Sequence, residues 1–100
     1  MSERRAFPRW AVALNCQTNG KAGSVPGVIN ELSENGLGLA SERVSEVGEE
    51  LGVEWRLEPD DDQLQVQCVV RDVNPVRIGV EFLNLSRACR LRIVRFITKQ

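Results

Sequence analysis

Hydrophobic and polar residues alternate along most of the chain, which is the pattern of β-strands with one buried face. The clearest alternation covers residues 51–57 and places Trp55 on its apolar side, so we expect Trp55 in the core. Turn-forming pairs such as Asn35-Gly36 interrupt the pattern. The alternation predicts six strands, near residues 12–18, 25–32, 37–40, 51–57, 64–70 and 76–82.

The last fifteen residues change to the period of an α-helix. Ser86 is a favourable N-cap. An apolar stripe at i, i+4, i+7 and i+8 follows it, formed by Cys89, Ile93, Phe96 and Ile97. Leu91 and Val94 flank this stripe, and we expect them to be partly exposed. The pattern favours an all-β-dominated fold, a six-stranded antiparallel β-barrel with one C-terminal helix that covers one opening.

Length and composition are those of one globular domain. The chain has 100 residues, of which 42% are hydrophobic and 27% charged. We predict a single domain over residues 1–100, with a flexible N-terminal segment (1–10), a barrel (11–84) and a helix (86–98). No apolar run approaches the ~20 residues of a membrane span, and no signal peptide is evident. We therefore expect a soluble cytoplasmic protein without membrane insertion.

Residues suited to catalysis or metal binding are scarce. The chain has no histidine, so it lacks the commonest general base and the commonest zinc ligand. Cys16, Cys68 and Cys89 are widely spaced in apolar segments and are expected to be reduced, buried thiols. The run from Asp60 to Asp62 lacks the spacing of a calcium loop and is expected to be a solvated loop. We predict no enzyme, no catalytic residue, no metal site and no cofactor.

Charge is unevenly distributed along the chain, although the net charge is only -1. Residues 31–62 contain eleven acids and two bases, whereas residues 63–100 contain seven bases and two acids. Arg71, at the end of the fifth predicted strand, is expected on the barrel exterior, paired with an acid. Nucleic-acid-binding modules usually carry a net basic charge, so nucleic acid is disfavoured as a partner. A basic N-terminal segment can still hold a small anion locally.

The N-terminal segment contains Arg5 and Arg9 in an RxxxR spacing, preceded by Arg4. Phe7 and Trp10 lie between and beside these arginines and can dock the segment on the barrel. Guanidinium groups bind phosphate with two parallel hydrogen bonds and stack on planar bases. The alternative is a solvated basic end of the chain with no ligand.

A second motif lies at the end of the second predicted strand, where Glu31, Ser33 and Gly36 have an acidic-x-Ser-x-x-Gly spacing. On a strand, residues 31 and 33 point to the same face, so both can reach one ligand. Gly36 is expected to supply either a positive φ angle or a close backbone approach. The alternative is an ordinary hairpin in which Ser33 bonds its own turn.

The two motifs together resemble those of the PilZ domain family, a β-barrel receptor for cyclic di-GMP. The resemblance covers about residues 4–98 and includes the run from Ile78 to Phe82 near the end of the barrel. It implies a split-barrel type of fold and a ligand site made of two groups. The first group is Arg5 and Arg9, which clamp phosphate and guanine, with Arg4 immediately before them. The second group is Glu31, Ser33 and Gly36. Position 31 departs from the family, which has Asp or Asn there.

The resemblance implies binding of cyclic di-GMP and a relay to an unidentified protein partner through ordering of the arginine segment. A basic residue at Arg4 is typical of members that bind an intercalated ligand dimer. The alternative is a PilZ-fold protein-interaction module with weak or no cyclic di-GMP binding because of Glu31, contacting a partner through Leu91 and Val94. A third reading, an RNA-binding barrel, is disfavoured by charge and by the absence of tyrosine. The oligomeric state is not indicated.

Overall fold

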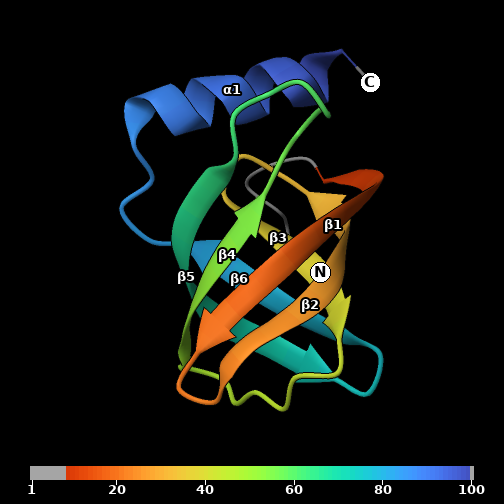
Figure 1. Cartoon of the computed structure of the whole chain (residues 1–100), viewed down its shortest axis with the longest axis vertical. Helices are drawn as coiled ribbons and strands as arrows, with labels where there is room; N and C mark the ends of the chain where they lie inside the picture. Colours follow the sequence, from red (N-terminus) through yellow and green to blue (C-terminus); the bar gives the residue numbers. More distant parts are fainter. Residues whose placement is uncertain (1–8, 100) are drawn as a thin grey trace, which may run out of the picture.

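The computed structural model describes residues 9–99. It contains six strands and one helix, in the order β1 (Trp10–Gly20), β2 (Gly23–Leu32), β3 (Gly36–Ser41), β4 (Glu50–Trp55), β5 (Leu64–Asn74), β6 (Arg77–Phe82) and α1 (Arg87–Thr98). All strand pairs are antiparallel, and the order β1-β2-β3-β6-β5-β4 closes into a barrel because β4 pairs with β1 (Figure 1). The predicted fold class is confirmed.

The core fills the inside of the barrel with the apolar residues that alternate along each strand. Ile29, Leu39, Val53 and Val70 are completely buried. Trp55 is 2% exposed and stacks on Phe82 with ring centroids 6.2 Å apart, which confirms its predicted place in the core. The predicted period-two pattern therefore identified the inward face of the strands.

Helix α1 lies across one end of the barrel (Figure 1). Its Ile93 and Ile97 are buried, and the Ser86 hydroxyl accepts a hydrogen bond from the backbone N–H of Cys89, as an N-cap does. The guanidinium of Arg92 donates to the carbonyl oxygen of Asp62 at 2.6 Å, which joins the helix to the β4–β5 loop. Leu91 is 48% exposed, as predicted.

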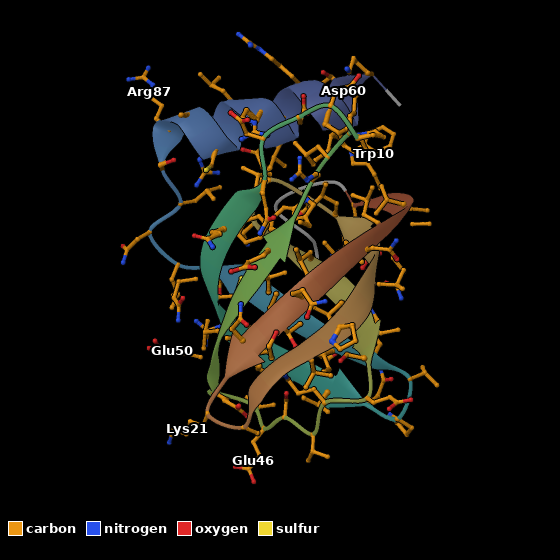
Figure 2. The ribbon with its side chains drawn as sticks, viewed as in Figure 1. Trp10, Lys21, Glu46, Glu50, Asp60 and Arg87 are labelled. Atoms are coloured by element: carbon orange, nitrogen blue, oxygen red, sulfur yellow. The ribbon has the colours of Figure 1, made fainter. Side chains whose placement is uncertain are left out.

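The opposite end of the barrel is closed by a buried arginine that the sequence pattern did not reveal. Arg43, in the β3–β4 loop, is 7% exposed. Its Nε donates to the Thr18 hydroxyl at 2.8 Å, and its Nη2 donates to the carbonyl oxygens of Thr18, at 3.2 Å, and Gly23. Figure 2 shows Lys21 of the β1–β2 turn and Glu46 of the β3–β4 loop at this end, and Asp60 at the α1 end.

The ends of β5 and β4 and the burial of Cys89 differ from the sequence prediction. β5 continues to Asn74 rather than residue 70, because a bulge between Val70 and Asp72 lets it stay paired with β6. β4 ends at Trp55, although Leu57 beyond it is still buried. Cys16 and Cys68 are buried as expected, but Cys89 is only partly buried, although it packs against the core. Within residues 9–99, no helix is both long and apolar enough to cross a membrane.

Candidate ligand-binding site

Four residues form a row across the outside of strands β2, β3, β6 and β5. Glu31 pairs with Gly38, Gly38 with Gly79, and Gly79 with Asp72. Their neighbours along β3 and β6 point into the core, so by strand alternation these residues point outward. The two middle residues, Gly38 and Gly79, have no side chains, so the centre of the row is left open.

Arg77 fills that space. A Cβ atom placed on Gly38 would lie 2.5 Å from Nε and 2.7 Å from Cζ of Arg77, and closer still to Nη2. A Cβ atom on Gly79 would lie 3.4 Å from Nη1 of the same guanidinium. The Arg77 side chain is 23% exposed. The glycine pair therefore gives the Arg77 guanidinium its place against the barrel wall.

Acidic residues at both ends of the row hold this guanidinium. Nη2 of Arg77 lies 2.5 Å from Oε1 of Glu31, and Nη1 lies 3.6 Å from Oδ2 of Asp72. The first contact is a charge-assisted hydrogen bond and the second a looser ion pair. Arg77 was not among the predicted site residues. The sequence signal that could have indicated it is a glycine at an outward position in each of two strands, Gly38 and Gly79, which the structure pairs.

Glu31 also holds the one residue of the RxxxR motif that the structure describes. Nη1 of Arg9 donates to Oε1 of Glu31 at 2.9 Å, the same oxygen that accepts from Arg77. The structure therefore brings the predicted site residues Arg9 and Glu31 together, across 22 positions of sequence. Arg4 and Arg5 lie outside the described residues.

Ser33 has a different position from the one expected. β2 ends at Leu32, so Ser33 lies in the turn and is 6% exposed, rather than next to Glu31 on the strand face. Its hydroxyl accepts from the backbone N–H groups of Asn35 and Gly36, both at 3.2 Å, and lies 3.2 Å from the Gly36 carbonyl oxygen. The turn chemistry considered as the alternative is therefore present at Ser33.

Gly36 is needed for close approach rather than for a special backbone angle. A Cβ atom there would overlap the carbonyl oxygen of Val80 and lie 3.1 Å from the Cα atom of Glu81. Among residues 9–99, the glycines with positive φ are Gly23 and Gly48. Of the two roles expected for Gly36, the structure shows the close backbone approach, which brings β3 against β6.

Helix α1 contacts the same turn. Nη1 of Arg90 donates to the carbonyl oxygen of Glu34 at 3.1 Å and lies 3.5 Å from its carboxylate.

Arg71 pairs with Glu81 at 2.7 Å on the exterior, as predicted. Among the residues that the structure describes, no group of three or more cysteines and acids could hold a metal ion. The candidate site is thus an outer face of the barrel that carries Arg9 and Arg77, next to a turn held by the hydrogen bonds of Ser33.

The sequence profile of the PilZ domain matches residues 3–99 of the chain. The chain belongs to the PilZ domain family. No curated protein sequence matches this PilZ domain. Its fold is similar to that of the PilZ domain of YcgR from Escherichia coli, solved with c-di-GMP: the TM-score is 0.80 and the identity 17%, covering 97% of this chain and 91% of the other.

Two longer proteins contain a similar barrel. The inhibitor of motility MotI/DgrA from Bacillus subtilis has a TM-score of 0.83 and 18% identity, covering 98% of this chain and 51% of that protein. The K. pneumonia MrkH–c-di-GMP complex has a TM-score of 0.82 and 16% identity, covering 98% of this chain and 52% of MrkH. This PilZ domain thus spans about half the length of MotI/DgrA and MrkH. At such low identity the likeness shows the fold.

Proposed function

We propose that this PilZ domain is a receptor for cyclic di-GMP, bound on the outer face of β2, β3 and β6. The observation that carries the proposal is the position of Arg9, whose guanidinium lies against this face on Glu31, 2.9 Å from its carboxylate. Family membership supports it, as do the structures of the YcgR PilZ domain and of MrkH with the same ligand.

The chemistry of arginine suits this ligand. Cyclic di-GMP carries two phosphodiesters and two guanines, and guanidinium binds phosphate oxygens and the O6 and N7 atoms of guanine with paired hydrogen bonds. A guanidinium has five N–H groups. Arg9 can therefore keep its bond to Glu31 and present other N–H groups to the ligand, while Arg5 completes the clamp and Arg4 adds positive charge.

The proposed output is a change in the N-terminal segment. Ligand binding orders the Arg4–Arg9 segment against the Glu31–Gly36 side of the barrel and creates a composite surface for a protein partner. Hydrogen–deuterium exchange with and without cyclic di-GMP tests this step. We expect slower exchange in residues 4–9 in the complex, and unchanged exchange there at ligand saturation would contradict the relay but leave ligand binding intact.

Calorimetric titration with cyclic di-GMP tests the proposed function itself. We expect binding by the wild-type domain and a loss of at least about tenfold in affinity in Arg9→Ala, because each charge-assisted hydrogen bond contributes about 1.5–3 kcal/mol. Arg95→Ala is the matched control, since Arg95 is an exposed arginine on α1. No binding by the wild type at high micromolar ligand would refute the proposal.

The second candidate function is a PilZ-fold interaction module with weak or no ligand binding. It is favoured by Glu31, which is longer than the family's Asp or Asn and whose Oε1 atom already accepts from two arginines. Comparing the wild type with Glu31→Asp distinguishes the two functions. If only Glu31→Asp binds cyclic di-GMP, the natural protein is the interaction module; binding by the wild type supports the receptor.

A further inference from the structure

Asp72, Arg77, Glu31 and Arg9 form a continuous chain of charged contacts across the outside of the barrel. Nη1 of Arg77 lies 3.6 Å from Oδ2 of Asp72, and Nη2 lies 2.5 Å from Oε1 of Glu31. Glu31 then holds Arg9 through the same carboxylate oxygen. Arg9, which we propose binds the ligand, is thus connected to the rigid sheet through Arg77.

Arg77 is the fixed member of this chain. Its guanidinium lies over Gly38 and Gly79, in the space that side chains at those positions would fill. Its side chain is 23% exposed, whereas that of Arg9 is 36% exposed. An anchored cation restricts the rotamers of the Glu31 carboxylate, and the restricted carboxylate in turn restricts Arg9. Long side chains otherwise lose considerable rotamer entropy when they are ordered on binding.

The contacts also give a reason for glutamate at position 31. Glu31 and Arg77 lie on β2 and β6, with β3 between them. The Arg77 guanidinium lies over Gly38 on β3, and the Glu31 carboxylate must reach it there from β2, where Glu31 is the ladder partner of Gly38. Aspartate is shorter by one methylene, about 1.5 Å. A carboxylate withdrawn by that distance would lose its hydrogen bond to Arg77.

We propose that Arg77 is a positioning residue for ligand binding: it fixes Glu31, and Glu31 holds Arg9 ready for the anionic ligand. This rests on the proposed function, cyclic di-GMP binding. Arg77 acts through Glu31 rather than by touching the ligand, because its guanidinium lies between two carboxylates and its side chain is less exposed than that of Arg9. The role of Glu31 in this chain is to orient arginines.

A double-mutant cycle in calorimetric titrations with cyclic di-GMP tests the proposal. We expect Arg77→Ala to bind about fivefold more weakly, the scale of ordering one long side chain. In the Glu31→Ala background, Arg77→Ala should cause no further loss, because the side chain that links Arg77 to Arg9 is already removed. If the double variant loses affinity by the product of the two single losses, Arg77 contacts the ligand directly and the proposal is wrong. Unchanged or tighter binding by Arg77→Ala would also overturn it.

Gly38→Ala provides a second variant that leaves all four charged residues in place. Its Cβ atom would occupy the position of the Arg77 guanidinium, so we expect a similar loss of affinity. Gly52→Ala is the matched control, because a Cβ atom there would lie 3.4 Å from its nearest neighbour, Oε1 of Gln67. Wild-type affinity in Gly38→Ala would contradict the positioning role.

Nuclear magnetic resonance of the ligand-free protein gives a readout that does not depend on affinity. The Nε–H signal of Arg9, assigned by its absence in Arg9→Lys, should show restricted motion in the wild type and free motion in Arg77→Ala. Equal mobility in both proteins would overturn the proposal. Lack of ligand binding by the wild type refutes the proposed function together with this inference, whereas wild-type binding that Arg77→Ala leaves unchanged refutes only the inference.

Discussion

At the residue scale, two glycines on the outer face of the barrel, Gly36 and Gly38, are required for different reasons. At Gly38 a side chain would meet the guanidinium of Arg77 and displace it from the sheet without moving any backbone. At Gly36 it would meet the backbone of Val80 and Glu81, which is fixed by the β3–β6 ladder. A methyl group at these two positions should therefore affect different properties, ligand affinity at Gly38 and stability at Gly36.

Gly36→Ala should lower the free energy of unfolding by about 1–3 kcal/mol, the usual cost of forcing an extra group into a packed site. Urea denaturation followed by the fluorescence of buried Trp55 measures this. Gly52→Ala is again the control, since its added methyl group meets no backbone atom within 3.4 Å. Equal stability of Gly36→Ala and the wild type would mean that β3 and β6 can move apart at this point.

The buried cysteines predict a pH dependence of stability. Burial raises the pKa of Cys16 from 9.0 to about 11 and that of Cys68 from 9.0 to about 12. Because the charged thiolate forms more readily in the unfolded chain, the stability contributed by these thiols is complete below pH 9 and is lost as pH rises toward 11 and 12.

We expect the free energy of unfolding to fall between pH 9 and pH 11, measured by urea denaturation at fixed ionic strength. Iodoacetamide at pH 8 should modify partly exposed Cys89 and leave Cys16 and Cys68 unmodified until urea unfolds the domain. Cys89→Ser is the control that removes the accessible thiol. Rapid labelling of Cys68 in the folded protein would show that the barrel opens far more often than its packing indicates.

At the scale of elements, the sequence was sufficient to predict all six strands and the helix, because each has one clear buried face. The errors are where alternation is broken or hidden. The period-two alternation of strands placed Ser33 on a strand, but β2 ends one residue earlier and the chain turns. The end of β5 carries exposed residues beyond a bulge, so no apolar face marked its pairing.

The candidate site was predictable only in part. Arg9 and Glu31 were identified from motif spacing, and the structure brings them together. The place of Arg77 in the site depends on the register of β2, β3 and β6. This register brings Arg77 beside Glu31, although the two lie 46 positions apart in sequence. Spacing within one segment carries no information about such a pair.

Helix α1 provides an element-scale prediction through its N-cap. Ser86→Ala removes the hydroxyl that accepts the Cys89 N–H at 3.1 Å and should cost about 1 kcal/mol of stability. Thermal unfolding followed by circular dichroism measures the loss. Ser86→Asp, which restores an acceptor, should recover most of the stability; if it does not, the cap contributes little and apolar packing of Ile93 and Ile97 holds the helix in place.

On the scale of the whole molecule, the barrel is closed at both ends by different means. Helix α1 lies across one end (Figure 1) and covers it with apolar side chains, and the Arg43 guanidinium fills the other end. Within the described residues, the acceptors of the Arg43 side chain are the Thr18 hydroxyl and the carbonyl oxygens of Thr18 and Gly23, with no carboxylate among them. These bonds connect the β3–β4 loop to the β1–β2 hairpin.

Arg43→Ala should therefore be one of the most destabilising single changes of a charged residue in this protein. It removes a side chain that is 7% exposed, leaves a cavity, and deprives Thr18 and Gly23 of their donor. Such changes cost about 2–4 kcal/mol. Arg71→Ala is the matched control, because the Arg71 side chain is 60% exposed and its surface pair with Glu81 should contribute less than about 1 kcal/mol. Urea denaturation of both variants gives the comparison. Equal stability would mean that water replaces the guanidinium at this end at little cost, and that the barrel is held closed by its strand ladder alone.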